Sequence, residues 1–430
     1  MSVAAVCLAT FLLLVTLTGG HRSGLRLTKE EKALIDAAEG TMRVLTTDSE
    51  EDTAVLRRQC TDLDIKDIDS EHFRKLARLM SDTMISPEQG GVGIAGPQVG
   101  LNRRVVAVQR FDKEGEPVEV YPNIRIEEYR GEMQPGREGC LSVPELKGSV
   151  MRYREILVSY IDPATLERTE ETVKGFTAVI FQHEADHLDG ILYTDKADSI
   201  TLPIAPEHWI AEDESGEMQM SLSDNTLDII APEGLTLWYD RPFNGEYVIS
   251  YHISMPMDGC GHDRLSDLNC FWAAKDPLHP DDITVRSEER KGVFSSYNML
   301  DLFYVGYGGN HNTTTRFRRY YGAKYGQPDA EVKPLIREYT DHDHLLVPGK
   351  WYFVEISVSS DSTSFHVNGE KLFEASLSDK EDKLSAESQP DTDNTSGTST
   401  SQTCSAGDGH FALRLLQNHT RLRNLRISRK

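Results

Sequence analysis

His183 and His187 stand four positions apart in the segment 182–187, Gln-His-Glu-Ala-Asp-His. In a helix, side chains at i and i+4 project from the same face, so two imidazoles at this spacing can bind one metal ion. Glu184 lies beside them, and a carboxylate next to a metal-bound water can accept its proton. The pattern alone leaves two interpretations open: a hydrolytic metal site, or an amphipathic helix with two histidines near its surface.

A catalytic site of this type has three protein ligands and keeps one position open for water. Cys140 is the best candidate for the third ligand, because it lies in the turn-like segment Glu138-Gly139-Cys140-Leu141-Ser142. A thiolate in a tight turn can be presented to a metal. A single cysteine is more often buried and inert, and this alternative stays open on the residues alone.

The two histidines need a helix to hold them. The pattern predicts that helix from Phe176 to Asp189, with Gly190 as its C-terminal stop. Strands are predicted at 105–108, 156–160 and 169–173, with a polar, turn-rich region between the first two that ends near Cys140.

The segment 28–80 predicts a helix, a loop and a second helix. Thr28 and Glu31 are placed to form a capping box at the first helix, and Ser70 to cap the second. The second helix should end at Ser86-Pro87. The segment 90–100 that follows is too rich in glycine for a helix interior.

Beyond about residue 226, short alternating strands and turns predict an all-β sandwich. Asn368-Gly369 predicts the turn of a hairpin. The segment 379–408 is acidic and rich in Ser and Thr, which predicts a disordered insertion, and 411–427 predicts a last pair of strands.

Length and charge restrict the classes of protein. The 430 residues exceed one ordinary core, which favours two or three domains, and the net charge of -23 argues against nucleic acid as a partner. Six cysteines are too few for a disulfide framework. Cys260 and Cys270 either pair or remain free thiols.

The first 17 residues are apolar and uncharged, and shorter than the ~18 of a spanning helix. They predict a signal peptide or an uncleaved N-terminal anchor over 1–24, with a short buried helix as the alternative. The chain would then be exported (periplasmic or secreted) or membrane-anchored. It would be cytoplasmic, without a membrane partner, if the leader is not a signal.

Three segments, 91–98, 138–142 and 182–187, together resemble the three signature motifs of peptide deformylases and follow their order. The resemblance covers about residues 28–200. One departure is Pro122-Asn123, which reverses the expected Asn-Pro. The resemblance implies an α+β peptide-deformylase fold, with sheets around a central metal-binding helix.

The same resemblance implies that Cys140, His183 and His187 bind one divalent metal ion. Ferrous iron (Fe2+) would be the natural metal, with zinc (Zn2+) or nickel (Ni2+) as substitutes. The ion would activate water for attack on the formyl group of N-terminal formylmethionine, releasing formate from N-formylmethionyl peptides.

Catalytic roles also follow from the resemblance. Glu184 would move the proton from water to the leaving amine. The side-chain amide of Gln98 and the backbone N–H of Leu141 would stabilise the oxyanion.

A peptide must approach its enzyme closely, and the glycines Gly91 and Gly93 leave room for a strand-like substrate. By resemblance, apolar side chains would line the methionine pocket. Plain core packing is the alternative for each of them. The pocket residues would be Ile94, Phe176, Val179 and Ile180.

The segment 226–430 resembles a concanavalin A-like jelly roll of an uncharacterised bacterial family. The stretches that carry this resemblance are 306–316, 344–352 and 418–424. A carbohydrate ligand on this domain is one expectation, and loop shaping with core packing is the other. The candidate sugar-binding residues are Trp272, Tyr307, Asn310, Asn312 and Arg316.

The expected domains are therefore a leader (1–24), a deformylase catalytic domain (25–200), a linker (201–225) and a sandwich (226–430). The leading hypothesis is a deformylase with an appended sandwich. A carbohydrate- or protein-binding protein with a vestigial deformylase-like domain is the alternative, and a hydrolase of a related amide is a third. The intact set of predicted site residues argues against a vestigial domain.

Overall fold

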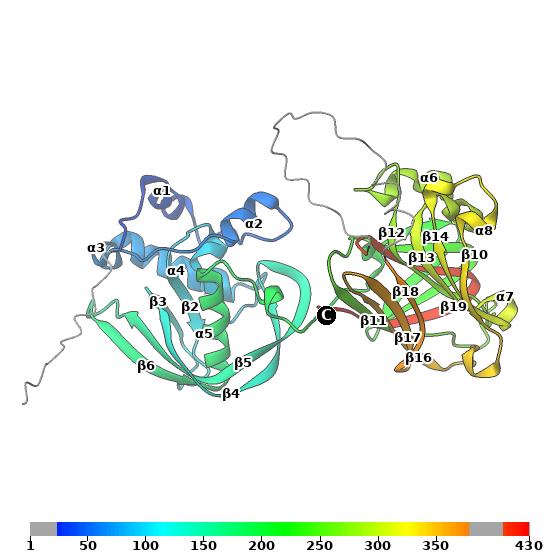
Figure 1. The fold of residues 1–430 in the computed structure, drawn as a ribbon. Helices are drawn as coiled ribbons and strands as arrows, with labels where there is room; N and C mark the ends of the chain where they lie inside the picture. Colours follow the sequence, from blue (N-terminus) through cyan, green and yellow to red (C-terminus); the bar gives the residue numbers. More distant parts are fainter. Residues whose placement is uncertain (1–23, 378–406, 430) are drawn as a thin grey trace, which may run out of the picture. The chain divides into compact units, whose positions relative to one another are not determined.

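The computed structural model describes residues 24–377 and 407–429 (Figure 1). They divide into two compact units. The first contains Met1–Gln134 and Arg152–Leu192, and the second contains Pro135–Met151 and Tyr193–Lys430. The predicted leader and the predicted disordered insertion lie outside the described residues, apart from residues 24, 407 and 408.

The helices near the start of the first unit are α1 (Lys29–Ala37), α2 (Glu50–Leu56), α3 (Ile65–Ile68) and α4 (Glu71–Ile85). The predicted capping box of α1 is confirmed. The Glu31 N–H donates to the Thr28 hydroxyl at 3.2 Å, and the Thr28 N–H donates to the Glu31 carboxylate at 2.7 Å. Ser70 caps α4, which ends before Ser86 as predicted.

A small antiparallel sheet follows, with β1 (Gly93–Ala95), β2 (Val105–Gln109) and β3 (Val118–Pro122) in the order β1-β2-β3. The glycine-rich segment forms β1 and the 3₁₀ turn η1 (Gly96–Val99), so it is not a helix interior. Among the described strands, β1 pairs only with β2 and is therefore an edge strand.

The prediction of a turn-rich region before Cys140 is wrong. Two long strands, β4 (Arg125–Cys140) and β5 (Val143–Ile161), pair with each other, and β6 (Arg168–Lys174) pairs with β5. Most of β4 is exposed, so its strand-forming residues are polar rather than alternating with apolar ones. The predicted strands 156–160 and 169–173 lie within β5 and β6.

The histidine helix is α5 (Gly175–Leu188), one residue offset from the prediction. Gly190 follows it with φ of +74°, and a Cβ there would lie 2.3 Å from the Arg57 carbonyl oxygen. Only glycine fits this position. The core around α5 combines its own side chains with those of both sheets: Val106, Val108, Ile156, Val158, Val173, Phe181 and Leu188. This arrangement is the predicted one, with sheets around a central helix.

The second unit is built mainly of antiparallel strands. Its strands are β7 (Ser199–Thr201), β8 (Trp209–Asp213), β9 (Gln219–Ser223), β10 (Thr226–Tyr239), β11 (Tyr247–Ser254), β12 (Leu268–Lys275), β13 (Asp301–Gly308), β14 (Thr314–Tyr320), β15 (Leu335–Tyr339), β16 (Trp351–Val358), β17 (Ser362–Val367), β18 (Glu370–Ser376) and β19 (His410–Arg429). Its short helices are α6 (Ser287–Arg290), α7 (Gly309–Asn312) and α8 (Asp329–Val332).

Trp272 shows how these strands enclose a core. The strand order is β15-β14-β13-β12-β19-β11-β16-β17-β18. Trp272 on β12 stacks with Phe303 of the neighbouring strand β13, with ring centroids 5.6 Å apart. It also stacks with Phe365 of β17, with ring centroids 6.0 Å apart. Since β12 and β17 are far apart in the strand order, the two halves of the sheet must face each other, as in a sandwich.

The hairpin prediction is confirmed: Asn368 and Gly369, with φ of +51° and +86°, connect β17 to β18. The prediction of a last pair of strands is wrong, because 411–427 lie in the single strand β19. Gln417 and Asn424 have positive φ, and the pairing register shifts near both. They mark β-bulges and not a chain reversal.

Within the segment predicted as a linker, β8 and β9 both pair with β10. Two prolines precede β8, and β9 is largely exposed, which explains the linker-like composition. The domain boundaries at 200 and 225 stay a prediction.

Cys260 and Cys270 are free thiols, so they do not pair with each other. Across 24–377 and 407–429, no helix is long and apolar enough to cross a membrane.

Candidate metal centre

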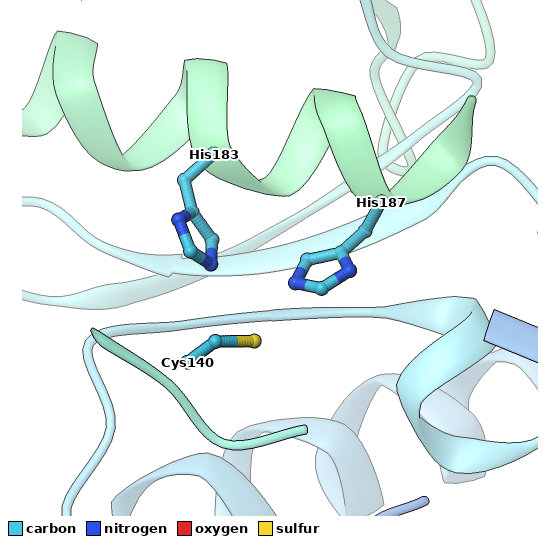
Figure 2. A group of neighbouring side chains, drawn as sticks. All are labelled: Cys140, His183 and His187. Atoms are coloured by element: carbon cyan, nitrogen blue, oxygen red, sulfur yellow. The ribbon is translucent and has the colours of Figure 1, made fainter. Parts of the chain in front are cut away.

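Helix α5 presents His183 and His187 on one face, as their spacing predicts. The two rings lie 5.1 Å apart between centroids, at 71° to each other. His187 is fully buried, and Figure 2 shows both rings pointing from the helix toward Cys140.

Cys140 is the last residue of β4, and its sulfur lies opposite the two imidazoles (Figure 2). One ligand atom from each of Cys140, His183 and His187 lies within 4.8 Å of the others. The Ser142 N–H donates to the Cys140 sulfur at 3.4 Å. A thiolate with two imidazoles suits zinc- and iron-type metals.

Glu184 lies on the same helix and is only 3% exposed. A Cβ added to Gly93 would lie 2.3 Å from Oε1 of Glu184 and 2.8 Å from a methyl of Ile180. Gly93 therefore leaves the space that the carboxylate occupies. The sequence suggested a different use for this glycine, the approach of a peptide backbone.

Gln98 is buried in η1, where its side-chain oxygen accepts from the Ala95 N–H at 2.7 Å. The Gln98 carbonyl accepts from the Leu45 N–H at 2.8 Å. These bonds fix the position of the amide and direct its NH₂ end away from Ala95. Leu141 directly follows Cys140, in the turn between β4 and β5.

The predicted pocket residues fall into two groups. Ile94, Val179 and Ile180 are buried, whereas Phe176 is 51% exposed and contacts Phe111, with ring centroids 5.4 Å apart. The Gly91 N–H donates to the Met84 carbonyl at 2.8 Å. Their roles toward a substrate remain predictions.

Two contacts that hold α5 were not identified as a site from the sequence. The Gln182 amide binds Tyr153 twice, accepting from its N–H at 3.1 Å and donating to its carbonyl at 2.7 Å. Arg152 donates to the Asp186 carboxylate at 2.5 Å, and both side chains are buried. No local sequence pattern pointed to Arg152 as the partner of Asp186.

Tyr193 is a further buried neighbour of Cys140. Burial raises its pKa, and negative charge on Cys140 and Glu138 raises it further. The phenol of Tyr193 is therefore a neutral group. Sequence analysis had assigned Tyr193 no role.

The structure does not support the predicted sugar-binding face as a whole, because two of its five residues are core residues. Trp272 and Tyr307 belong to the sandwich core and are at most 4% exposed. The Asn312 amide makes two hydrogen bonds with the Leu346 backbone, at 2.8 and 2.9 Å. Arg316 binds Glu338. Ring packing and loop closure account for most of the residues that resembled a ligand site.

Two family models match this chain. Residues 42–202 match the model described as Polypeptide deformylase, and residues 229–386 match one described as Domain of unknown function (DUF6250).

Curated relatives match the first part of the chain. "Peptide deformylase" of Symbiobacterium thermophilum is 42% identical over 129 residues, which cover 30% of this chain and 57% of that protein. "Peptide deformylase" of Leptospira biflexa is 37% identical over 155 residues, which cover 34% of this chain and 85% of that protein.

A solved structure also matches. It is described as "Met-ala-ser bound crystal structure of class I type b peptide deformylase from Acinetobacter baumannii" and is 34% identical in sequence. The match covers 36% of this chain and 98% of that chain, with a TM-score of 0.33.

Proposed function

The chain belongs to the peptide deformylase family, and we propose on this premise that it removes the formyl group from N-formylmethionyl peptides at the Cys140-His183-His187 centre. The observation that carries the proposal is the convergence of these three ligands within 4.8 Å, on the helix and hairpin that also place Glu184 and Leu141.

One Fe2+ ion is the proposed metal, with Zn2+ or Ni2+ as substitutes. The donor set fits such an ion, because one thiolate and two imidazoles leave a fourth position open for water. When bound, the ion supplies Lewis acidity that lowers the pKa of this water.

Glu184 is the proposed proton carrier. Its carboxylate accepts a proton from the attacking water and delivers one to the departing amine, so that formate and a free N-terminus are the products. Burial of Glu184 next to Gly93 limits its competing contacts with bulk water.

Gln98 and Leu141 are the proposed oxyanion donors. Negative charge develops on the formyl oxygen as water attacks, and a preformed N–H donor stabilises it without reorganisation. The hydrogen bond from Ala95 holds the Gln98 amide in one orientation, which supports this role.

The peptide backbone is proposed to bind as an added strand at β1. Among the described strands only β2 pairs with β1, so the other edge of β1 lacks a strand. Main-chain hydrogen bonds at such an edge recognise a peptide with little dependence on its sequence. Gly91 and Gly93, which have no side chains, are proposed to leave room for the peptide backbone near this edge. The proposed methionine pocket is formed by Ile94, Phe176, Val179 and Ile180.

Formate release tests this function. The chain is prepared anaerobically with Fe2+ and given a formylmethionyl tripeptide. Glu184→Gln should lose about 10²–10⁴ in rate. Glu170→Gln, at an exposed position on β6, should match the unaltered chain. Equal formate release with and without Glu184 would contradict the assignment.

We also propose that the second domain is a concanavalin A-like jelly roll. The packing of β12 against β17 through Trp272 and Phe365 supports it, because the two halves of one long antiparallel path face each other. An experimental structure of the full chain tests the strand connections, and an order other than two Greek keys would refute this assignment.

A further inference from the structure

The loop between β11 and β12 carries Cys260 and Asp263, and these two residues meet His419 of β19. One ligand atom from each of the three lies within 4.8 Å of the others. We propose that this cluster is a second metal site, in the C-terminal domain, that takes a divalent cation of the zinc class. The proposal is independent of the deformylase function.

The imidazole of His419 is the strongest evidence. It is 5% exposed, and its Nε2 lies 2.8 Å from a carboxylate oxygen of Asp228. A carboxylate can only accept, so Nε2 donates to Asp228, and a metal-bound ring would present the lone pair of Nδ1. Nδ1 is buried and has no hydrogen-bond partner.

Asp263 faces this lone pair. Its Oδ1 lies 3.4 Å from Nδ1 of His419, and it too is buried without a hydrogen-bond partner. Leaving buried polar atoms unsatisfied costs free energy. A cation between them satisfies both.

The loop holds the ligands in place through its own backbone. The Gly259 N–H donates to Oδ2 of Asp263 at 2.6 Å, which leaves Oδ1 toward the site. The Asp263 N–H donates to the Cys260 carbonyl at 3.0 Å. This turn brings the thiol and the carboxylate to the same side of the loop.

The surrounding charge favours a dication. Asp258 lies 3.7 Å from Nδ1 of His419 and is a candidate fourth ligand, with water as the alternative. Arg421 is the cation that bridges Asp228 and Asp258, at 2.7 and 2.9 Å. Asp228 and Asp258 share this one guanidinium, and Asp263 adds a third carboxylate at the site, so negative charge is in excess.

The donor types identify the class of metal. A thiolate, an imidazole and a carboxylate suit zinc, whereas calcium and magnesium prefer oxygen ligands alone. Asp228 would be the outer carboxylate that commonly fixes the ring of a metal-bound histidine. Binding releases the Cys260 proton, and the bound ion links the loop after β11 to β19.

Zinc stoichiometry of the full chain tests the site. Cys140→Ser removes the thiolate of the deformylase centre and serves as the background. In this background the chain should retain one tightly bound Zn2+, and adding Cys260→Ser or Asp263→Asn should remove it. His262→Asn is the matched control, because His262 is an exposed ligand-type residue of the same loop outside the cluster.

Cobalt provides a second measurement that does not depend on activity. In the Cys140→Ser background, Co2+ should give a thiolate-to-cobalt charge-transfer band that Cys260→Ser abolishes and His262→Asn preserves. Asp228→Asn should weaken Zn2+ binding by about 10–100-fold.

The alternative to a metal ion is a proton on Nδ1 of His419 that forms a hydrogen bond to Asp263. In that case the background chain would bind no tight Zn2+, and its cobalt spectrum would lack the thiolate band. Either result overturns the proposal, as does equal zinc content with and without Cys260. A Cys260→Ser variant that keeps Cys140 should still release formate. This result would show that the second metal site is not needed for catalysis.

Discussion

Gly93 determines whether Glu184 can occupy its place beside the metal ligands. The missing side chain leaves a space that the carboxylate fills, since an added Cβ would lie 2.3 Å from Oε1. Residue 93 must therefore be glycine to make room for Glu184, apart from any room that a peptide substrate needs.

Gly93→Ala should therefore displace Glu184 and lower kcat/KM by about 10²-fold, the scale of a misplaced catalytic group. Steady-state formate release measures it. Gly309→Ala is the control, because a Cβ there would meet nothing closer than 3.6 Å. An alanine variant with full activity would show that the carboxylate moves aside without loss.

Gln98→Ala removes a proposed oxyanion donor. The expected loss is about 10²–10³ in kcat, with little change in KM, because the donor acts on charge that exists only in the transition state. A raised KM at unchanged kcat would instead assign Gln98 to substrate binding.

At the scale of elements, the position of α5 depends on contacts to β5. Gln182 and Asp186 bind Tyr153 and Arg152, which are neighbours on that strand. The helix that carries the metal ligands is thereby anchored to the strand that follows Cys140.

Arg152→Leu removes the cation of the buried ion pair with Asp186. Breaking a buried pair in this way should destabilise the first domain by about 3–5 kcal/mol. Urea unfolding measures the loss. The double variant Arg152→Leu/Asp186→Leu should recover most of it, and a double variant no more stable than the single would contradict this explanation.

Arg110 joins the small sheet to β6. Its guanidinium binds Asp112, Glu119 and Glu171, and it is only 1% exposed. The hydrogen bond from Arg110 lowers the pKa of Asp112 below its ordinary value.

A depressed carboxyl pKa stabilises the fold above the unfolded-state value of about 3.9, and this stabilisation is lost as pH falls through the folded-state value. Asp112→Asn should therefore lower Tm at pH 7 and show a smaller further drop below pH 4. Asp82→Asn, at an exposed position on α4, is the control. If Tm falls with pH in parallel for Asp112→Asn and the unaltered chain, the depressed pKa of Asp112 does not contribute to stability.

At the scale of the whole molecule, the chain combines a deformylase domain with a β-rich domain whose sequence matches a family of unknown function. Trp272 and Tyr307 of the second domain are core residues and not an exposed sugar face, and the proposed metal site lies at His419. Deformylation and this second domain therefore call for separate measurements.

Export of the chain remains a proposal that rests on the apolar leader. Residues 1–24 fused to a reporter that is active only outside the cytoplasm should give activity. Replacing Leu12 and Leu14 with arginine should abolish it, because charge in the apolar run prevents its recognition as a signal. A reporter that stays inactive would favour a cytoplasmic enzyme.

The sequence by itself determined the features that depend on local order. The spacing of His183 and His187 set their common face, Thr28 and Ser70 set helix starts, and Asn368-Gly369 set a hairpin. Each of these follows from interactions within a few residues, which a sequence pattern can reveal.

Only the tertiary structure decided what depends on residues far apart in the chain. It buried Trp272 in the core, paired Arg152 with Asp186, and brought Cys260 to His419. It also turned the polar segment before Cys140 into a long strand, β4. Such outcomes depend on burial and on long-range pairing, and composition or periodicity along the chain carries no record of which distant residues will meet.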